Sequence, residues 1–162
     1  MLNKEKTAQE RKNGIFKLLY EWVEAITAAL AVVVLIFAFL FRLISVDGTS
    51  MMTTLADGER LILSRLPYTP ARGDIVVINY EESRKGEPLS KRIIGLPGDT
   101  IEVNRETGEV LRNGEVLNEP YIHVPTATEQ MTGAVTVPAG QVFVMGDNRL
   151  PGCSWDSRSF GC

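Results

Sequence analysis

Histidine is almost absent from the sequence, with one residue, His123, among 162. Cysteine is scarce as well: Cys153 and Cys162 lie at the end of the chain and are not spaced as CxxC. This excludes a recognisable zinc finger or di-histidine site, and we expect no metal and no cofactor. Neither GxGxxG nor GxxxxGK[ST] occurs, so no known nucleotide-binding loop is present. The net charge of −3 gives no reason to expect nucleic-acid binding.

Charge is missing from one long stretch, AITAALAVVVLIFAFLF at residues 25–41, which is seventeen residues long. A helix needs roughly 20 apolar residues to cross a bilayer, and about 17 is the lower limit. Arg42 can snorkel to the headgroups, which lets the residues up to Ser45 extend the span. Buried helices of soluble proteins are seldom apolar on every face, and the preceding segment is long for a secretory n-region. The pattern therefore predicts a retained transmembrane helix over residues 25–45.

Basic residues are distributed unevenly about this stretch. Five lysines and arginines precede it, and beyond Arg42 at its edge the next one is Arg60. The positive-inside rule then predicts a cytoplasmic tail at residues 1–24 and an extracytoplasmic domain at residues 46–162.

No long amphipathic helical pattern follows residue 46. Short runs rich in β-branched residues, joined by Gly- and Pro-rich turns, instead predict an all-β domain. Asn113-Gly114, between two apolar runs, is a strong hairpin signal. Strands are expected within residues 60–66, 74–79, 90–95, 100–103, 109–117, 133–137 and 141–145, and loops at 81–87 and 120–132.

One expected strand contains a lysine whose direction matters. In KRII, residues 91–94, alternation places Lys91 on the same face as Ile93 and Arg92 on the other face. If Ile93 faces the core, the lysine is buried, its pKa falls, and its neutral amine can act as a base. If Arg92 faces the core edge instead, Lys91 is an ordinary surface residue. Alternation alone leaves both arrangements open.

A candidate nucleophile, Ser50, lies shortly after the apolar stretch in VDGTSMMTTL. A lone serine has a simple structural explanation, because it could cap a short helix beginning at Met51. It becomes a nucleophile only when a neighbouring group takes its proton. His123 is one candidate base, but it lies in a loop with no adjacent acid, which is typical of a surface histidine. Lys91 is the other, because Ser-Lys pairs are a known nucleophile–base arrangement.

A third group of polar residues occupies MGDNRLPGCSWDSRSFG at residues 145–161. Asp156 and Arg158 are two residues apart, so on a strand they would share a face and could pair. A solvated polar loop is the simpler explanation. The apolar strand QVFVM leads directly into the cluster, however, which favours polar groups delivered to a specific place.

Together these stretches resemble the membrane-bound type I signal peptidases, the Ser-Lys proteases that release signal peptides from exported proteins. The resemblance covers most of the chain. GTSM at residues 48–51, GDIVV at 73–77, KRIIGLPGD at 91–99, and GDNR with SWDSR within 146–158 are similar to four boxes of that family, in the same order. It implies a mostly β fold, with a signal-peptidase-like β-sheet catalytic domain behind a single N-terminal transmembrane helix.

The resemblance also implies a role for each matching residue. Ser50 would attack the scissile carbonyl, and Lys91 would act as the general base. Ser154 would hydrogen-bond and orient the lysine amine. Asp156 and Arg158 would form a supporting ion pair.

Further implied roles concern the oxyanion and the substrate. The Ser50 N–H would be one oxyanion donor. Gly48 stands where some family members have a serine that supplies the second donor, so its backbone or another group would replace that hydroxyl. Met51 would help line the pocket for a small residue. The implied partners are the lipid bilayer and signal peptides of exported preproteins, cleaved after a small-x-small site.

The sequence departs from the family pattern in three places. SMMTTL has Thr53 where the family usually has proline, which removes a constraint on the nucleophile loop. RLPGCSWDSR has two more residues than usual before Ser154. Family members usually continue past SFG with another strand, so the chain is expected to be a fragment or a variant with an exposed sheet edge.

These departures leave alternatives open. The chain could be a catalytically weak or inactive membrane-anchored β-domain that binds peptides or assists surface assembly. It could also be a Ser-Lys peptidase with one dedicated client. An extracytoplasmic domain would in addition permit a disulfide between Cys153 and Cys162.

Overall fold

The computed structural model describes residues 2–79, 88–128, 131 and 133–162. The loop expected at residues 81–87 lies outside the described residues. The chain divides into two parts, which are described separately. The helical part comprises Met1–Leu43 and Ile62–Leu66, and the β part comprises Ile44–Leu61 and Pro67–Cys162.

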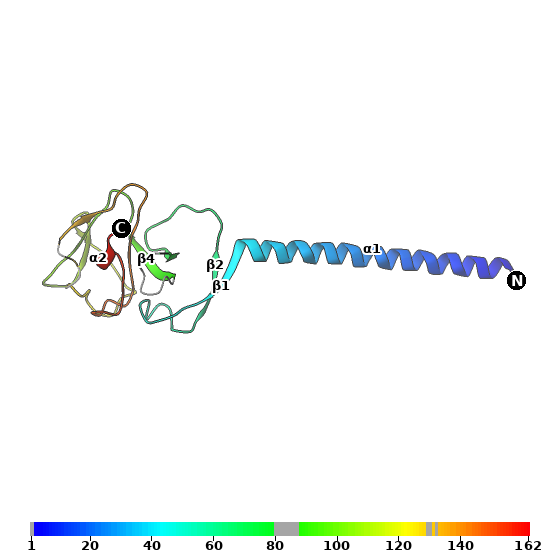
Figure 1. The fold of residues 1–162 in the computed structure, drawn as a ribbon, viewed down its shortest axis with the longest axis horizontal. Helices are drawn as coiled ribbons and strands as arrows, with labels where there is room; N and C mark the ends of the chain where they lie inside the picture. The colour runs from blue at the N-terminus through cyan, green and yellow to red at the C-terminus, as the bar shows by residue number, and fades with distance from the viewer. Residues whose placement is uncertain (1, 80–87, 129–130, 132) are drawn as a thin grey trace. The chain divides into compact units, whose positions relative to one another are not determined.

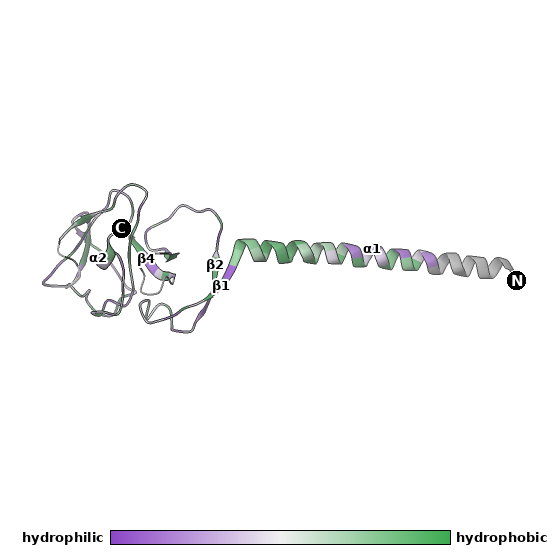
Figure 2. Cartoon of the chain, in the orientation of Figure 1, coloured by the Kyte–Doolittle hydropathy of each residue, from purple (hydrophilic) through white to green (hydrophobic). Residues whose placement is uncertain are grey.

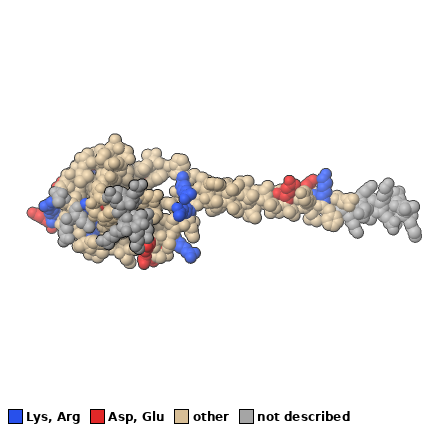
Figure 3. Space-filling view, in the orientation of Figure 1, with Lys and Arg blue, Asp and Glu red and all other residues tan. Residues whose placement is uncertain are grey.

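One long helix, α1 (Leu2–Leu40), dominates the helical part (Figure 1). Its segment Asn13–Leu40 has a mean hydropathy of 2.6 and is the one helix among the described residues that is long and apolar enough to cross a membrane. Hydrophobic residues follow one another along the end next to β1 (Figure 2), and charged side chains gather toward the other end (Figure 3). The expected apolar helix is therefore present.

The helix ends earlier than the sequence predicts. It stops at Leu40 rather than Ser45, and Phe41–Ser45 form strand β1, which pairs with β2 (Arg60–Ser64) in a two-stranded sheet. The last carbonyls of a helix have no partner within it. The Arg65 N–H donates to the Leu40 carbonyl at 2.9 Å, which satisfies one of them at the point where the chain becomes extended.

Two further antiparallel sheets form the β part. The first has the order β3–β4–β9, and the second the order β7–β6–β5–β8. Their strands are β3 (Ile75–Ile78), β4 (Leu89–Gly95), β5 (Thr100–Val103), β6 (Val110–Arg112), β7 (Glu115–Val116), β8 (Val135–Thr136) and β9 (Phe143–Met145). Each lies within a predicted segment except β4, which begins one residue earlier, at Leu89, so the mostly β fold is confirmed. Asn113 and Gly114 have φ of 56° and 84° and form the predicted β6–β7 hairpin turn, which needs positive φ at both positions.

The C-terminal residues differ from the expectation. Asp156 and Arg158 do not lie on a strand, because Ser157–Phe160 form a short helix, α2, whose N-cap is Asp156. The Asp156 side chain accepts a hydrogen bond from the Arg158 N–H, as N-cap residues do. Cys153 and Cys162 are free, half-buried thiols, so the disulfide considered above is not formed.

Apolar residues from both of these sheets form the main core of the β part. It contains Ile94, Ile101, Val103, Val110, Met131, Val137, Phe143 and Met145. A smaller cluster of Val46, Met51 and Leu55 lies within and before the turn that carries Ser50. Ser50, the candidate nucleophile, therefore directly precedes Met51, which packs in this smaller cluster.

One buried carboxylate, Asp99, joins three turns of the β part. It accepts hydrogen bonds of 2.9 Å from Arg72 Nε and Nη2, from the Leu96 N–H and from Asn113 Nδ2. Arg72 precedes β3, Leu96 follows β4, and Asn113 lies between β6 and β7. The hydrogen bonds from Arg72, aided by those from Leu96 and Asn113, outweigh burial and hold the pKa of Asp99 well below its usual range.

Replacing this carboxylate should destabilise the fold in a pH-dependent way. We expect Asp99→Asn to lower the free energy of unfolding by about 1–3 kcal/mol near pH 7, because the amide cannot pair with Arg72 and leaves donors unmatched. The folded-state pKa lies below the unfolded value of about 4, so the stabilisation is present above that value and lost as pH falls through the folded pKa. Denaturant unfolding of the full chain should therefore show a smaller difference at about pH 2.5. An equal difference at both pH values would contradict this.

Candidate active site

Ser50 lies on a turn rather than at the start of a helix. The Met52 N–H donates to the Thr49 carbonyl at 3.1 Å, and the Leu55 N–H to the Met51 carbonyl at 2.9 Å. Met51 is 1% exposed and packs in the small apolar cluster, which anchors the turn immediately after the serine. The helix-capping explanation for Ser50 is therefore not met. The expected role of Met51 in lining a substrate pocket stays a prediction.

The direction of Lys91 on β4 is resolved. Lys91 and Ile93 are each 1% exposed, so both lie on the buried face, while Arg92 is half-buried. Ile94 is buried as well, because the pairing of β4 with β9 shifts register between Ile93 and Gly95. This irregularity breaks the alternation that a regular strand would keep. The structure therefore realises the arrangement with an inward lysine.

The amine of Lys91 meets the hydroxyl of Ser50. Lys91 Nζ is 2.8 Å from Ser50 Oγ and also donates to the Ser90 carbonyl at 2.9 Å. Burial disfavours the charged ammonium and is the main reason that the pKa of Lys91 falls to about 8. Asp156 raises this pKa, Arg158 lowers it and Asp147 raises it, so the nearby charges partly offset one another. A lysine with this pKa is neutral in a sizeable fraction of molecules at mildly alkaline pH.

Asp156 forms the centre of a buried polar cluster near this pair. Its carboxylate accepts from Arg158 Nε and Nη2 at 2.9 Å, from Ser154 Oγ at 2.6 Å and from the Gly146 N–H at 3.0 Å. Burial alone would raise the pKa of Asp156, but these hydrogen bonds and the Arg158 charge outweigh it and hold that pKa below its usual range. The carboxylate thus stays ionised and fixes the C-terminal segment to the end of β9.

Two of the residues implied by the resemblance make contacts other than those expected. Ser154 is expected to hydrogen-bond Lys91, whereas its hydroxyl donates to Asp156. Gly48 has φ of 91°, which favours glycine, and its N–H donates to Asp57 Oδ1 at 2.8 Å. The orienting and oxyanion roles of these residues stay predictions.

Gly146 lies where the two halves of the site meet. A Cβ built on it would lie 2.3 Å from Ser154 Oγ and 2.5 Å from the Ser50 carbonyl oxygen. Real Cβ atoms essentially never approach other atoms so closely. We call residues 49–55, the turn that carries the candidate nucleophile Ser50, the nucleophile turn. Glycine is required at position 146 because the nucleophile turn and the cluster around Asp156 approach each other closely there.

Asn148 holds the nucleophile turn, a role that was not predicted from the sequence. Its N–H donates to the Ser50 carbonyl and its Nδ2 to the Thr49 carbonyl, each at 3.0 Å. These bonds fix the two peptide groups that flank the Ser50 Cα, one of which contains the Ser50 N–H. The partners are 99 residues apart at one of the bonds, so no local pattern could have revealed them.

The adjacent Asp147 connects the same turn to the strand that carries the lysine. It accepts from Arg92 Nε at 2.9 Å and Nη2 at 2.7 Å, and also from Thr54 Oγ1. We call Thr54, Asp147 and Arg92 the Asp147 network. Bidentate pairs of this type add geometric specificity to their charge. The network therefore joins the nucleophile turn to β4.

Arg149, which follows these residues, is fully buried and holds the segment between Glu119 and Ala127. It pairs with Glu119 through both terminal nitrogens and donates to Thr126 Oγ1 at 2.8 Å, while its carbonyl accepts from the Ala127 N–H at 3.0 Å. Its Nε donates to the Gly146 carbonyl at 2.8 Å. A buried arginine needs such partners, and here they attach the irregular segment to the end of β9.

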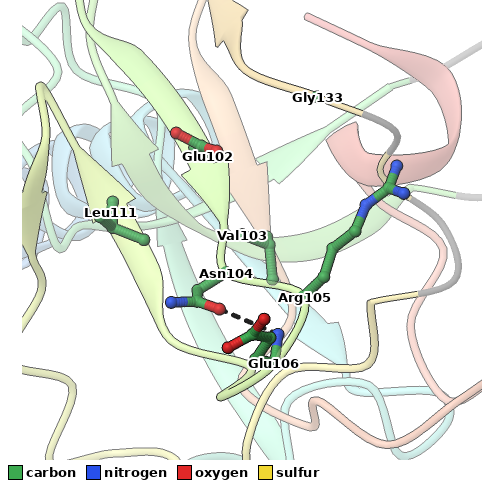
Figure 4. Close-up of a pocket in the computed structure, with 7 residues that line it drawn as sticks. All are labelled: Glu102, Val103, Asn104, Arg105, Glu106, Leu111 and Gly133. Atoms are coloured by element: carbon green, nitrogen blue, oxygen red, sulfur yellow. Dashed lines mark hydrogen bonds between the residues drawn. The ribbon is translucent and has the colours of Figure 1, made fainter.

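A pocket of the β part lies away from the Ser50–Lys91 pair. One polar pocket is lined by residues of β5, β6 and the turn between them, together with Gly133; none of the residues in Figure 4 belongs to the Ser50–Lys91 site. In that pocket the Glu106 N–H donates to Asn104 Oδ1 at 2.9 Å. In the described part of the chain, no three His, Cys, Asp or Glu side chains group as metal ligands would.

A serine hydroxyl held against the amine of a buried lysine is the arrangement that Ser-Lys hydrolases use. Comparison with known proteins identifies the family. A family model described as "Signal peptidase, peptidase S26" matches residues 19–162. The chain therefore belongs to the signal peptidase family, peptidase S26.

Individual relatives agree with this family. Signal peptidase I of Bacillus licheniformis is 41% identical over 166 residues, which cover 96% of this chain and 84% of that protein. Signal peptidase I T of Bacillus subtilis (strain 168) is 40% identical over 168 residues, which cover 97% and 82%. The crystal structure of a signal peptidase I from Enterococcus faecalis V583 shows 35% identity and a TM-score of 0.46, covering 58% of this chain and 88% of that one.

Adding one methyl group at Gly146 should disrupt the site. We expect Gly146→Ala to lower cleavage activity about a hundredfold or more, because the Ser50 backbone or Ser154 must move and small misplacements near reacting groups are costly. The matched control is Gly133→Ala, where a Cβ would have nothing within 4 Å. Activity of both variants would be assayed together with thermal unfolding. Wild-type activity in Gly146→Ala would show that the approach is not tight.

Proposed function

We propose that the chain is a serine endopeptidase that removes N-terminal signal peptides from exported preproteins, with Ser50 as nucleophile and Lys91 as general base. One observation carries the mechanism: the 2.8 Å contact between Lys91 Nζ and Ser50 Oγ, with the lysine 1% exposed. Family membership supports the substrate class, since the relatives bear the name signal peptidase I.

The proposed chemistry proceeds in two transfers. Neutral Lys91 Nζ takes the Ser50 hydroxyl proton as Oγ attacks the scissile carbonyl carbon. The tetrahedral intermediate collapses, Lys91 donates its proton to the leaving amine, and an ester to Ser50 remains. Lys91 then takes a proton from water, which attacks the ester, and returns it to Ser50 as the acid product leaves. The Ser50 N–H, held by the Asn148 bonds to the flanking peptides, donates to the developing oxyanion.

The Asp156 cluster supports this proposal because it fixes the direction of the hydrogen bond that the Ser154 hydroxyl donates. Because the Ser154 hydroxyl proton is directed to Asp156, its remaining lone pairs can only accept from a nearby donor. An amine that donated to Ser154 would keep its own lone pair free for the Ser50 proton. Arg158 keeps Asp156 ionised, so this polarity does not reverse near neutral pH.

Substrate and location complete the proposal. Preproteins would be cleaved after a small-x-small site, with Met51 beside the pocket for the small residue. Residues 1–24 would form the cytoplasmic tail, residues 25–45 the anchor, and residues 46–162 the extracytoplasmic catalytic domain, as the positive-inside rule implies.

Removing either member of the dyad should abolish cleavage. The full chain in detergent would be incubated with a preprotein that carries an Ala-x-Ala site, and the product termini read by mass spectrometry. We expect Ser50→Ala and Lys91→Ala each to lose activity at least a thousandfold, because nucleophile and base act as one unit. Ser159→Ala, an exposed serine on α2, is the matched control that should cleave normally. Cleavage by Ser50→Ala would reject the mechanism.

The reaction should depend on pH through the lysine. Because Lys91 must be neutral to accept a proton and its pKa is lowered to about 8, kcat/KM should rise about tenfold per pH unit below 8 and level off above it. A pH series from about 6 to 10, with folding monitored at each point, measures the midpoint. A midpoint near the ordinary lysine value of about 10.4 would contradict the effect of burial.

A further inference from the structure

His123, the one histidine of the chain, contacts the nucleophile turn from a distant segment. Its Nε2 lies 2.6 Å from Thr53 Oγ1, across a separation of 70 residues. Thr53 is three residues after Ser50. Both side chains are exposed, so neither is required to fill the core. The proposed dyad uses neither residue.

The segment that presents His123 is firmly attached. Arg149 binds Glu119 at one end and the residues around Thr126 at the other. The Thr126 N–H also donates to the Gly108 carbonyl at 2.9 Å. The imidazole is therefore carried by a segment with fixed ends rather than by a free loop.

Tyr121, two residues before the histidine, links the same segment to β4. The guanidinium carbon of Arg92 lies 4.1 Å from the centre of the Tyr121 ring, within the range of a cation–π contact. Arg92 belongs to the Asp147 network, which reaches Thr54. The Thr53–His123 bond therefore closes a ring of contacts that runs from the turn to β4 and back.

We propose that His123 is a positioning residue: by holding Thr53, it fixes the turn of Ser50 relative to the strand of Lys91. The inference rests on the proposed function, because it assigns the pair to the geometry of that dyad. Asp147 and Asn148, which follow β9, hold residues 49, 50 and 54 of the turn. His123, which lies in a different segment, holds Thr53. The resemblance predicts proline at position 53.

The chemistry of the two groups suits positioning. A threonine hydroxyl both donates and accepts, and a neutral imidazole nitrogen does one or the other according to its tautomer. An imidazolium donates from either nitrogen, so the hydroxyl can still accept from it. The contact thus needs no particular protonation state, and His123 has no proton-transfer role in this proposal.

A double-mutant cycle on the full chain in detergent tests the pair. We expect Thr53→Val and His123→Ala each to lower kcat about fivefold with KM within about twofold, because dyad geometry rather than substrate affinity is affected. The double variant should be no slower than either single variant, since both remove one interaction. Thr53→Ser should restore activity to within about twofold of wild type.

Two controls separate positioning from general structure. Thr107→Val removes another exposed threonine hydroxyl with a side-chain hydrogen bond, to Glu109 at 2.9 Å, and should leave kcat unchanged. Unfolding temperatures of all variants should stay within about 2 °C of wild type, and the midpoint of the pH profile should not move.

The outcomes are distinguishable. Wild-type kcat in Thr53→Val, or losses that multiply to about twenty-five-fold in the double variant, would overturn the positioning role while Ser50→Ala remains inactive and the dyad stands. Loss of the pH-profile inflection in His123→Ala would instead make the histidine a base and overturn the role as stated. Cleavage by Ser50→Ala would reject the dyad and the positioning role with it.

Discussion

The burial of the Lys91 side chain is the constraint on which the rest of the site depends. Taking an ammonium group out of water is costly by several kcal/mol unless polar partners compensate for it. Among the described residues, the hydrogen-bond partners of the Lys91 amine are a hydroxyl and a carbonyl, Ser50 Oγ and Ser90 O, rather than a carboxylate. Such surroundings favour the neutral amine, so the burial that destabilises the charged form also supports the proposed role of Lys91 as a base.

The charged side chains near this lysine form ion pairs with one another. Asp156 is matched to Arg158, and Asp147 to Arg92, with both carboxylates almost fully buried. Both carboxylates raise the pKa of Lys91, and the charge of Arg158 lowers it, so loss of Arg158 would raise that pKa further. The Asp156–Arg158 pair therefore also limits how far Asp156 raises the pKa of Lys91.

The sequence predicted features whose cause is local. The apolar helix, the short strands and the Asn113-Gly114 turn follow from composition and turn chemistry within a few residues. Ser50 and Lys91 were identified through motif resemblance, while strand alternation alone left Lys91 and Arg92 undecided. The early end of α1 at Leu40 was missed, because it depends on pairing with a strand rather than on hydropathy.

Features that depend on long-range contacts were beyond the reach of the sequence. Asn148 and Arg149 lie in the GDNR stretch that carries part of the resemblance, but their partners, among them Thr49 and Glu119, are seen only where distant segments meet. The bond between Thr53 and His123 is of the same kind. A threonine in place of proline indicated a change in the nucleophile loop, but nothing nearby pointed to its partner.

The spacing of these contacts has a consequence for biogenesis. The nucleophile turn is synthesised first. Lys91 follows 41 residues after Ser50, and Asn148, which holds the turn, follows 99 residues after Thr49. Contacts so far apart in the sequence can form only after both of their segments have been synthesised. In a nascent chain, Ser50 therefore emerges well before the lysine and the asparagine that contact its turn.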